Sequence, residues 1–243
     1  IVKVFPAGTV SPDFIRSPDS YPKEAIGPLE LPSITNPGKG YLISANNHPF
    51  RTTESSHPDL LISVFSSGND RLQRLSSLIE NAPQDTQTLM EMQRDVFSMN
   101  SQTLRDLFLR NLPDELLSSP AASILSSWDG RFDSASRGAL AFSLISFHFA
   151  SNFYEDLYGP EITQYLLNSQ AVTDFIIEDL NNNQITPNPN VGKSLAAAIA
   201  GTDRTLRRYS NWGEFHKLKL SHSLKNLPLI GGRYKYAELP ASG

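Results

Sequence analysis

Proline is concentrated in the first 66 residues, and this limits what that part of the chain can form. Nine prolines fall there: Pro6, Pro12, Pro18, Pro22, Pro28, Pro32, Pro37, Pro49 and Pro58. Because proline fixes φ and removes a backbone donor, long helices are excluded from this stretch. Residues 1–5 can form a short strand, whereas residues 6–35 are expected to be irregular and to lie on another surface. We therefore predict an extended, proline-rich segment over residues 1–66.

One strand is predicted inside this segment, and two adjacent asparagines follow it. The turn signal Pro37-Gly38 precedes an apolar run over residues 40–45, and Asn46 and Asn47 come next. The two faces of the run are Tyr41, Ile43 and Ala45 on one side and Leu42 and Ser44 on the other. Since both faces are mostly apolar, the pattern indicates a strand buried on both sides.

Asn46 allows two interpretations at the end of such a strand. Asparagine tolerates a positive φ and hydrogen-bonds its own backbone, so Asn46 can simply be a turn residue. Alternatively, an amide held on a rigid strand can donate to a developing oxyanion. Asn47 points the opposite way by strand alternation, so we expect it to be structural.

After Gly68 the apolar residues recur at helical spacing, which predicts a helical domain over residues 67–210. Three helices are expected to begin at Asn69 or Asp70, at Asp85 or Thr86, and at Ser134 or Ser136. The second is expected to run to Pro113 with a bend near Asn100. The third is strongly apolar through Leu140, Leu144, Phe147 and Tyr154, so it should be the central buried helix. Further helices are predicted over residues 121–128, after Pro160, and over residues 171–180 and 191–209.

Two polar stretches are predicted to lack regular structure. Residues 181–190 are expected to form a polar loop, and residues 211–243 an irregular C-terminal segment. The fold class is therefore mainly α with a few β-strands.

The composition excludes several classes of function. The formal net charge is −4 and no block of like charge occurs, so neither nucleic acid nor an anionic membrane is indicated as a partner. The chain has no cysteine, which excludes disulfides and thiolate metal sites. The longest apolar run, residues 138–150, is too short to span a bilayer.

Several local motifs resemble sites but lack what the chemistry needs. Residues 20–23 match the S-x-x-K pattern of serine acyl-enzymes, yet Pro22 disfavours the helix that would bring lysine to serine. Asp179 opens a run like a calcium loop that lacks the glycine at position six and the glutamate at position twelve. We expect His216 and His222 to hydrogen-bond loop carbonyls and His148 to be a core histidine. Asp95 and Gln93 can be solvent-facing, and Asp129 and Asp133 look like cap residues.

The order of the longer motifs is more informative than any one of them. These motifs are Leu31-Pro32, Asn36-Pro37, Gly40-Tyr41, Ala45-Asn46-Asn47, Asp70-Arg71, Gln93-Arg94-Asp95 with Ser98, Trp128-Asp129-Gly130 with Asp133 and Ser136, and Trp212-Gly213 with His216 and His222. The series resembles the β-subunit of the penicillin acylase family, which are amidohydrolases of the N-terminal-nucleophile class. The resemblance covers nearly the whole chain, although Ser223 stands where the family usually has a proline after its histidine.

The resemblance implies an αββα sandwich, of which this chain supplies a helical insertion and an incomplete part. In the family, the serine that begins the β-subunit attacks the amide, and its own α-amine acts as the base. An α-amine with a pKa near 8 can accept that proton at about neutral pH without a histidine. The family's oxyanion donor corresponds to Asn46, and the arginine that supports the nucleophile region corresponds to Arg71. A calcium ligand of the family corresponds to Asp59, so a structural calcium ion is possible, and catalysis needs no cofactor.

The same resemblance sets expectations about partners. Because Ile1 is not a nucleophile, the serine, the α-subunit and the N-terminal part of the β-subunit are expected to precede this chain, with further strands after Gly243. The chain alone should then be inactive toward its small-molecule amide substrate, and the enzyme would be periplasmic or secreted. Alternatively, the chain is a non-catalytic helical scaffold or interaction module derived from that family.

Overall fold

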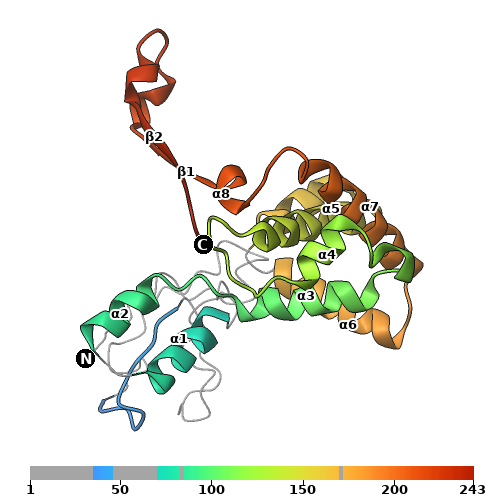
Figure 1. The fold of residues 1–243 in the computed structure, drawn as a ribbon, viewed down its shortest axis with the longest axis horizontal. Coiled ribbons are helices and arrows are strands. Elements are labelled where there is room, and N and C mark those ends of the chain that lie inside the picture. The colour runs from blue at the N-terminus through green and yellow to red at the C-terminus, as the bar shows by residue number, and fades with distance from the viewer. Residues whose placement is uncertain (1–34, 46–69, 83–84, 170–171) are drawn as a thin grey trace, which may run out of the picture. The chain divides into compact units, whose positions relative to one another are not determined.

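The computed structural model describes residues 35–45, 70–82, 85–169 and 172–243 (Figure 1). By its internal contacts the chain divides into two units, Ile1–Asn81 and Ala82–Gly243. The described residues are mostly helical, with one two-stranded sheet, so the predicted fold class is confirmed.

The first unit contains helix α1 (Asp70–Asn81), which has the bounds that its apolar spacing predicts. Glu80, near the end of α1, fixes the segment that follows the Pro37-Gly38 turn. The Glu80 carboxylate accepts a hydrogen bond from the Tyr41 hydroxyl, and Lys39 Nζ lies 3.4 Å from Glu80 Oε1. Glu80 therefore ties the end of α1 to the residues that lead towards Asn46.

The strand predicted over residues 40–45 is not formed with any described partner. Residues 41–44 have irregular backbone, because the two described strands pair with each other and leave none for this segment. The predicted burial of both faces is also wrong. Ala45 is buried and Tyr41 and Ile43 are partly buried, but Leu42 is 52% exposed. The side of the segment that carries Leu42 and Ser44 is therefore exposed.

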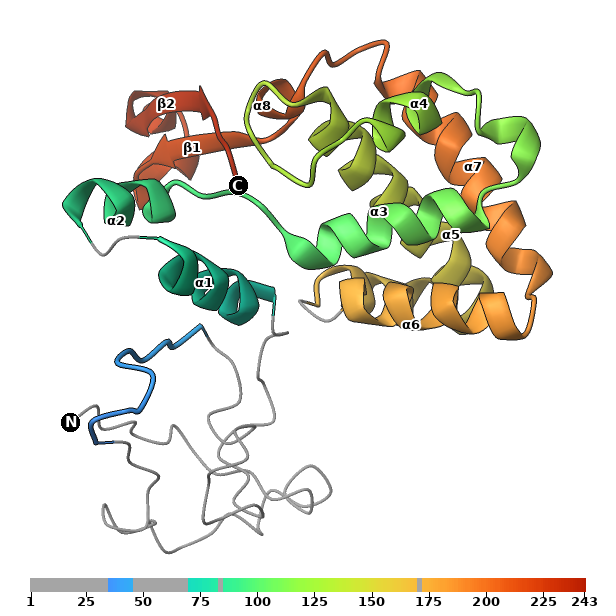
Figure 2. The same cartoon turned by 60° about the horizontal axis from the view of Figure 1, so that its bottom comes forward.

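Six helices make up most of the second unit (Figures 1 and 2). They are α2 (Thr86–Gln93), α3 (Met99–Asn111), α4 (Pro120–Ser126), α5 (Arg137–Leu167), α6 (Val172–Ile185) and α7 (Pro189–Thr205). Serines cap α3, α4 and α5: Ser98, Ser119 and Ser136 each accept a hydrogen bond from a backbone N–H in the first turn.

Helix α5 forms the centre of the core, as its sequence predicts. It packs along α7 and against α4 and α6, and its Leu140, Ile145 and Phe149 are fully buried. The rings of Phe149 and of Phe108 from α3 meet edge to face, with centroids 5.6 Å apart. Phe147, however, is 53% exposed, so α5 is not buried on every side.

Two helix boundaries differ from those that the sequence predicts, and a third agrees. The single helix expected up to Pro113 is two helices, because residues 94–98 leave the helical path and Phe97 pairs with Arg131. Helix α6 continues to Ile185, through part of the predicted loop. Helix α5 has a kink at Gly159, where φ is +79°, so Pro160 begins a new helical stretch as expected.

The segment over residues 211–243, which is predicted to be irregular, contains regular elements. It contains a short helix, α8 (Trp212–Phe215), and two antiparallel strands, β1 (Lys217–Ser221) and β2 (Lys235–Pro240). The strands pair from Lys217–Pro240 to Leu220–Ala237, with an irregularity between Leu220 and Ser221. The alternation of lysine and leucine along β1 is a period-two pattern that indicates a strand.

Candidate functional site

The three residues that the resemblance assigns to the site differ in what the structure says of them. Asn46 and Asp59 lie outside the described residues, as do Asn47 and the S-x-x-K pattern. Arg71 lies in the first turn of α1, directly after Asp70, and its side chain is exposed. The grouping of Asn46 and Arg71 therefore stays a prediction.

The later family motifs converge in space, and we call their meeting point the motif cluster. It consists of residues 95–98, 128–136, 212–216 and 241–243. Backbone hydrogen bonds join the first two segments: Ser98 N donates to Gly130 O at 3.1 Å, and Phe132 N donates to Val96 O at 3.0 Å. These two segments therefore share a short ladder of backbone hydrogen bonds, although α3 and α4 separate them in sequence.

The same ladder continues into the C-terminal segment. Trp212 N donates to Ser136 O at 2.9 Å, and Gly213 N donates to Ser134 O at 2.7 Å. Gly243 N then donates to Phe132 O at 2.9 Å. All four segments of the motif cluster are therefore connected through backbone atoms.

Three stretches of the chain, which we call excursions, leave the motif cluster and return to it. A backbone hydrogen bond joins the two ends of each excursion. The Ser98–Gly130 bond closes the excursion that contains α3 and α4, and the Ser136–Trp212 bond closes the one that contains α5, α6 and α7. A bond of 3.2 Å from Ala241 N to His216 O closes the third, which contains β1 and β2. Each excursion leaves the motif cluster and returns to it.

Aromatic rings fill the interior of the motif cluster. The Trp128 ring stacks on Phe142 at 4.5 Å between centroids, and Phe132 lies edge-on between Trp128 and Trp212, at 5.1 and 5.7 Å. Gly138 lets the start of α5 approach these rings, because a Cβ there would lie 2.5 Å from the Trp128 side chain. The tryptophans in the family motifs therefore act as packing anchors.

One arginine links the charges of the motif cluster. Arg131 Nη1 lies 3.1 Å from Asp95 Oδ1, and Arg131 Nε lies 3.2 Å from Asp133 Oδ2. Burial opposes the charge of Arg131, but the two carboxylates raise its pKa above the ordinary value. The side chain of Asp95 is only 10% exposed, so the prediction that Asp95 faces solvent is wrong. Asp129 accepts from Arg131 N at 3.0 Å, which agrees with its predicted role in the turn.

The three histidines in the described part of the chain contact other parts of the fold. His216 stacks on Trp212 at 4.6 Å, and its Nδ1 lies 3.3 Å from the Ala241 carbonyl, as predicted. His222 instead accepts from Leu224 N at 3.2 Å, so it caps a turn and does not bind a carbonyl there. His148 is partly buried against Gly201, and burial, followed by the charge of Arg204, lowers its pKa.

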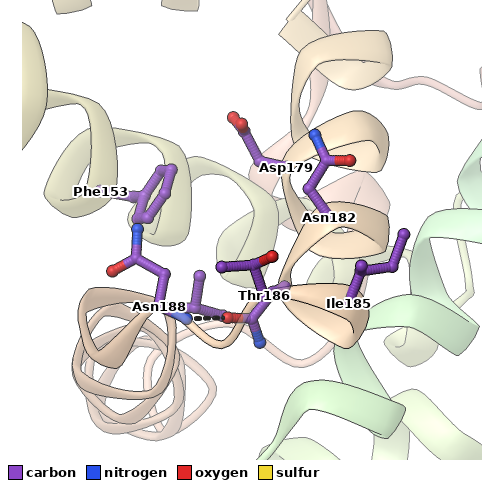
Figure 3. Close-up of a pocket in the computed structure, with 8 residues that line it drawn as sticks. Phe153, Asp179, Asn182, Ile185, Thr186 and Asn188 are labelled. Atoms are coloured by element: carbon purple, nitrogen blue, oxygen red, sulfur yellow. Dashed lines mark hydrogen bonds between the residues drawn. The ribbon is translucent and has the colours of Figure 1, made fainter.

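A pocket of about 220 Å³ opens between α5, α6 and the start of α7 (Figure 3). Phe153 lies on one side, and Asp179, Asn182 and Thr186 of the other wall come from α6 and the turn after it. The Asp179 carboxylate accepts from the Tyr154 hydroxyl at 2.8 Å, and Asn188 N donates to Asn183 Oδ1 at 2.6 Å. The first bond joins α5 to α6, and the second stabilises the α6–α7 turn. Asp179 lies in α6, within the helix predicted over residues 171–180.

The described part of the chain shows neither a metal-ligand cluster nor a membrane-spanning helix. It contains no group of three or more histidine, aspartate, glutamate or cysteine side chains arranged to hold a metal ion. Among the same residues, no helix is both long enough and apolar enough to cross a bilayer. Asp59 is outside the described residues, so these findings do not test it as a calcium ligand.

Comparison with known proteins bears on the family. No curated protein sequence matches the chain. The family model described as penicillin amidase matches residues 9–243, which include every motif in the ordered series and all four segments of the motif cluster. The resemblance inferred from the order of the motifs is thereby confirmed. The chain belongs to the penicillin amidase family.

Proposed function

We propose that this chain is part of an amide hydrolase that works by acyl transfer to an N-terminal serine located outside residues 1–243. The match to the penicillin amidase family over residues 9–243 is the observation that carries the proposal. The serine hydroxyl would attack the amide carbonyl and give its proton to its own α-amine. The resulting α-ammonium would pass that proton to the amide nitrogen of the tetrahedral intermediate, so that the C–N bond breaks and the amine product leaves. Water would then hydrolyse the acyl-enzyme.

Two residues of this chain would contribute to that reaction. The Asn46 side-chain amide would donate to the tetrahedral oxyanion, where a preorganised donor lowers the barrier. Arg71, at the start of α1, would support the region of the nucleophile. The link from Glu80 to Tyr41 supports this arrangement, because it fixes the chain five residues before Asn46.

The rest of the assembly follows from the same proposal. The α-subunit and the N-terminal part of the β-subunit would be the partners of this chain, and they would form most of the pocket for a small-molecule amide. Asp59 would contribute to a structural calcium site. The enzyme would act in the periplasm or outside the cell, and its substrates could include the β-lactams used in antibiotic biosynthesis.

Asn46 provides the test of the proposal. In the complete, processed enzyme, Asn46→Ala should lower kcat by about 10²–10³-fold, which is the usual cost of losing one oxyanion donor. KM should change less, because the ground-state carbonyl uses the donor less than the tetrahedral intermediate does. Asn47→Ala is the matched control, and it should lower stability by about 1 kcal/mol while sparing kcat. If both variants keep full kcat, Asn46 is a turn residue and the site assignment fails.

Arg71 is tested in the same enzyme. Arg71→Ala should lower activity while the helical circular dichroism signal stays unchanged, because the Arg71 side chain is exposed and alanine favours a helix. Unchanged kinetics would make Arg71 an ordinary surface residue.

A further inference from the structure

Helix α1 carries a charged residue of unfavourable sign near each of its ends. Arg71 is the second residue of the helix and Glu80 is the last but one. Because a helix has partial positive charge at its N-terminus and partial negative charge at its C-terminus, each residue lies at the end of its own sign. Asp70 stands beside Arg71, but the last turn of α1 contains no basic residue. The groups that stabilise Glu80 are therefore expected outside that turn.

Those groups come from residues 39–41, and we call Lys39, Tyr41 and Glu80 the Glu80 cluster. The Tyr41 hydroxyl donates to Glu80 Oε1, and Lys39 Nζ lies 3.4 Å from the same oxygen. Lys39 Nζ is also 5.9 Å from the centre of the Tyr41 ring. The hydrogen bond from Tyr41, followed by Lys39, lowers the pKa of Glu80, so its carboxylate is ionised at neutral pH.

A tight turn lies inside the Glu80 cluster. Gly40, between Lys39 and Tyr41, has a φ of +75°, which glycine adopts without strain. Its N–H donates to the Pro37 carbonyl at 2.8 Å. The turn and the bonds to Glu80 together fix the direction in which the chain leaves toward residues 41–45.

The Glu80 cluster restricts the residues that lead to Asn46. Tyr41 precedes Asn46 by five residues, which span at most about 18 Å when fully extended. Ala45, directly before Asn46, is only 1% exposed, so the far end of this segment is packed as well. Glu80 and Arg71 lie on one helix, about 14 Å apart at 1.5 Å per residue. Helix α1 therefore connects the segment before Asn46 to Arg71.

We infer that Glu80 is a positioning residue for the proposed amide hydrolysis, because through Tyr41 it fixes the segment before Asn46 relative to α1. This inference rests on the proposed function, since Glu80 acts through Asn46. A donor to an oxyanion has to be held within about 0.5 Å of its productive position. A displacement of about 1 Å can cost about 10²-fold in rate. Loss of Glu80 should therefore lower kcat more than it changes KM, as loss of Asn46 does.

Variants of the Glu80 cluster test the inference in the complete, processed enzyme. Glu80→Ala and Tyr41→Phe should each lower kcat by about tenfold while KM changes less. Combining them should lower kcat no further, because both remove the same hydrogen bond. Glu80→Gln should keep most of kcat, since its amide oxygen can still accept from Tyr41. Glu91→Ala is the matched control and should leave kcat unchanged, because Glu91 is an exposed glutamate near the end of α2 that accepts from Gln87 of its own helix at 2.7 Å.

The same substitution in an Asn46→Ala enzyme separates positioning from stability. There Glu80→Ala should lower kcat by less than about twofold, because the donor that Glu80 positions is already gone. An equal loss of kcat with and without Asn46, or no loss in either enzyme, overturns the inference and leaves the proposed function intact. Full kcat in the Asn46→Ala enzyme itself overturns the assignment of the oxyanion donor, and this inference with it.

Discussion

At the scale of single residues, two glycines in the first turns of long helices show opposite constraints. A Cβ on Gly138 would lie 2.5 Å from the Trp128 ring, whereas no atom lies within 4 Å of the corresponding position at Gly192. Glycine is otherwise costly in a helix, because it loses more backbone entropy on folding than alanine does. Close packing therefore accounts for Gly138 and not for Gly192.

Alanine substitutions should have opposite signs at these two positions. Gly138→Ala should lower the free energy of unfolding by about 1–3 kcal/mol, because the tryptophan at the centre of the motif cluster has to shift. Gly192→Ala should raise it by about 0.4–1 kcal/mol, because the unfolded chain loses freedom without a clash in the fold. Urea denaturation measures both values. Equal effects at the two sites would show that contact with Trp128 does not determine the need for glycine at residue 138, and that helix propensity alone sets the effect of alanine.

At the scale of elements, helix existence could be predicted from the sequence, but several boundaries could not. Apolar spacing and cap residues sufficed for α1, α4 and the start of α5. Helix α6 continues because Asn183 and Gln184 both donate to Asn111 Oδ1, at 2.8 and 2.7 Å. The contact joins residues about 70 positions apart, so no local pattern contains it.

The same holds for the functional motifs: some of their features could be predicted from the sequence, and others could not. Motif order was enough to predict the family, because it depends on residue types alone. The break between α2 and α3 could not be predicted, since it depends on the pairing of Phe97 with Arg131. The pairing of Asp95 with Arg131 depends on the same approach of distant residues, so no local pattern shows that Asp95 is largely buried. The lysine–leucine alternation of β1, by contrast, is a local pattern that is sufficient to predict this strand.

The ion pair between Asp95 and Arg131 should stabilise the junction between α2 and α3. Asp95→Asn removes the charge from a largely buried hydrogen bond, so we expect a loss of about 1–3 kcal/mol in the free energy of unfolding. Asp133→Asn is the control, because its carboxylate is 55% exposed and its ion pair should contribute only about 0–1 kcal/mol. Thermal or urea unfolding would compare them. A larger loss of unfolding free energy for Asp133→Asn would mean that the exposed ion pair between Arg131 and Asp133 stabilises the junction more than the buried pair does.

At the scale of the whole molecule, the proposed function requires that this chain be inactive by itself. An oxyanion donor without a nucleophile leaves acyl transfer without its covalent step, so the purified chain should hydrolyse no amide. A chromogenic anilide, with the complete enzyme as positive control, provides the measurement. Turnover by the chain that a serine-acylating reagent abolishes would contradict the assignment of the nucleophile to a serine outside residues 1–243.

The three excursions closed at the motif cluster have a consequence for evolution and engineering. Since each begins and ends at hydrogen-bonded neighbours, its length can change without moving the base from which it starts. Relatives could therefore gain or lose helices there as cassettes while retaining a common frame. For the same reason, the excursion between Ser136 and Trp212 could be exchanged between homologues as one graft, and its outer turns are natural places for circular permutation.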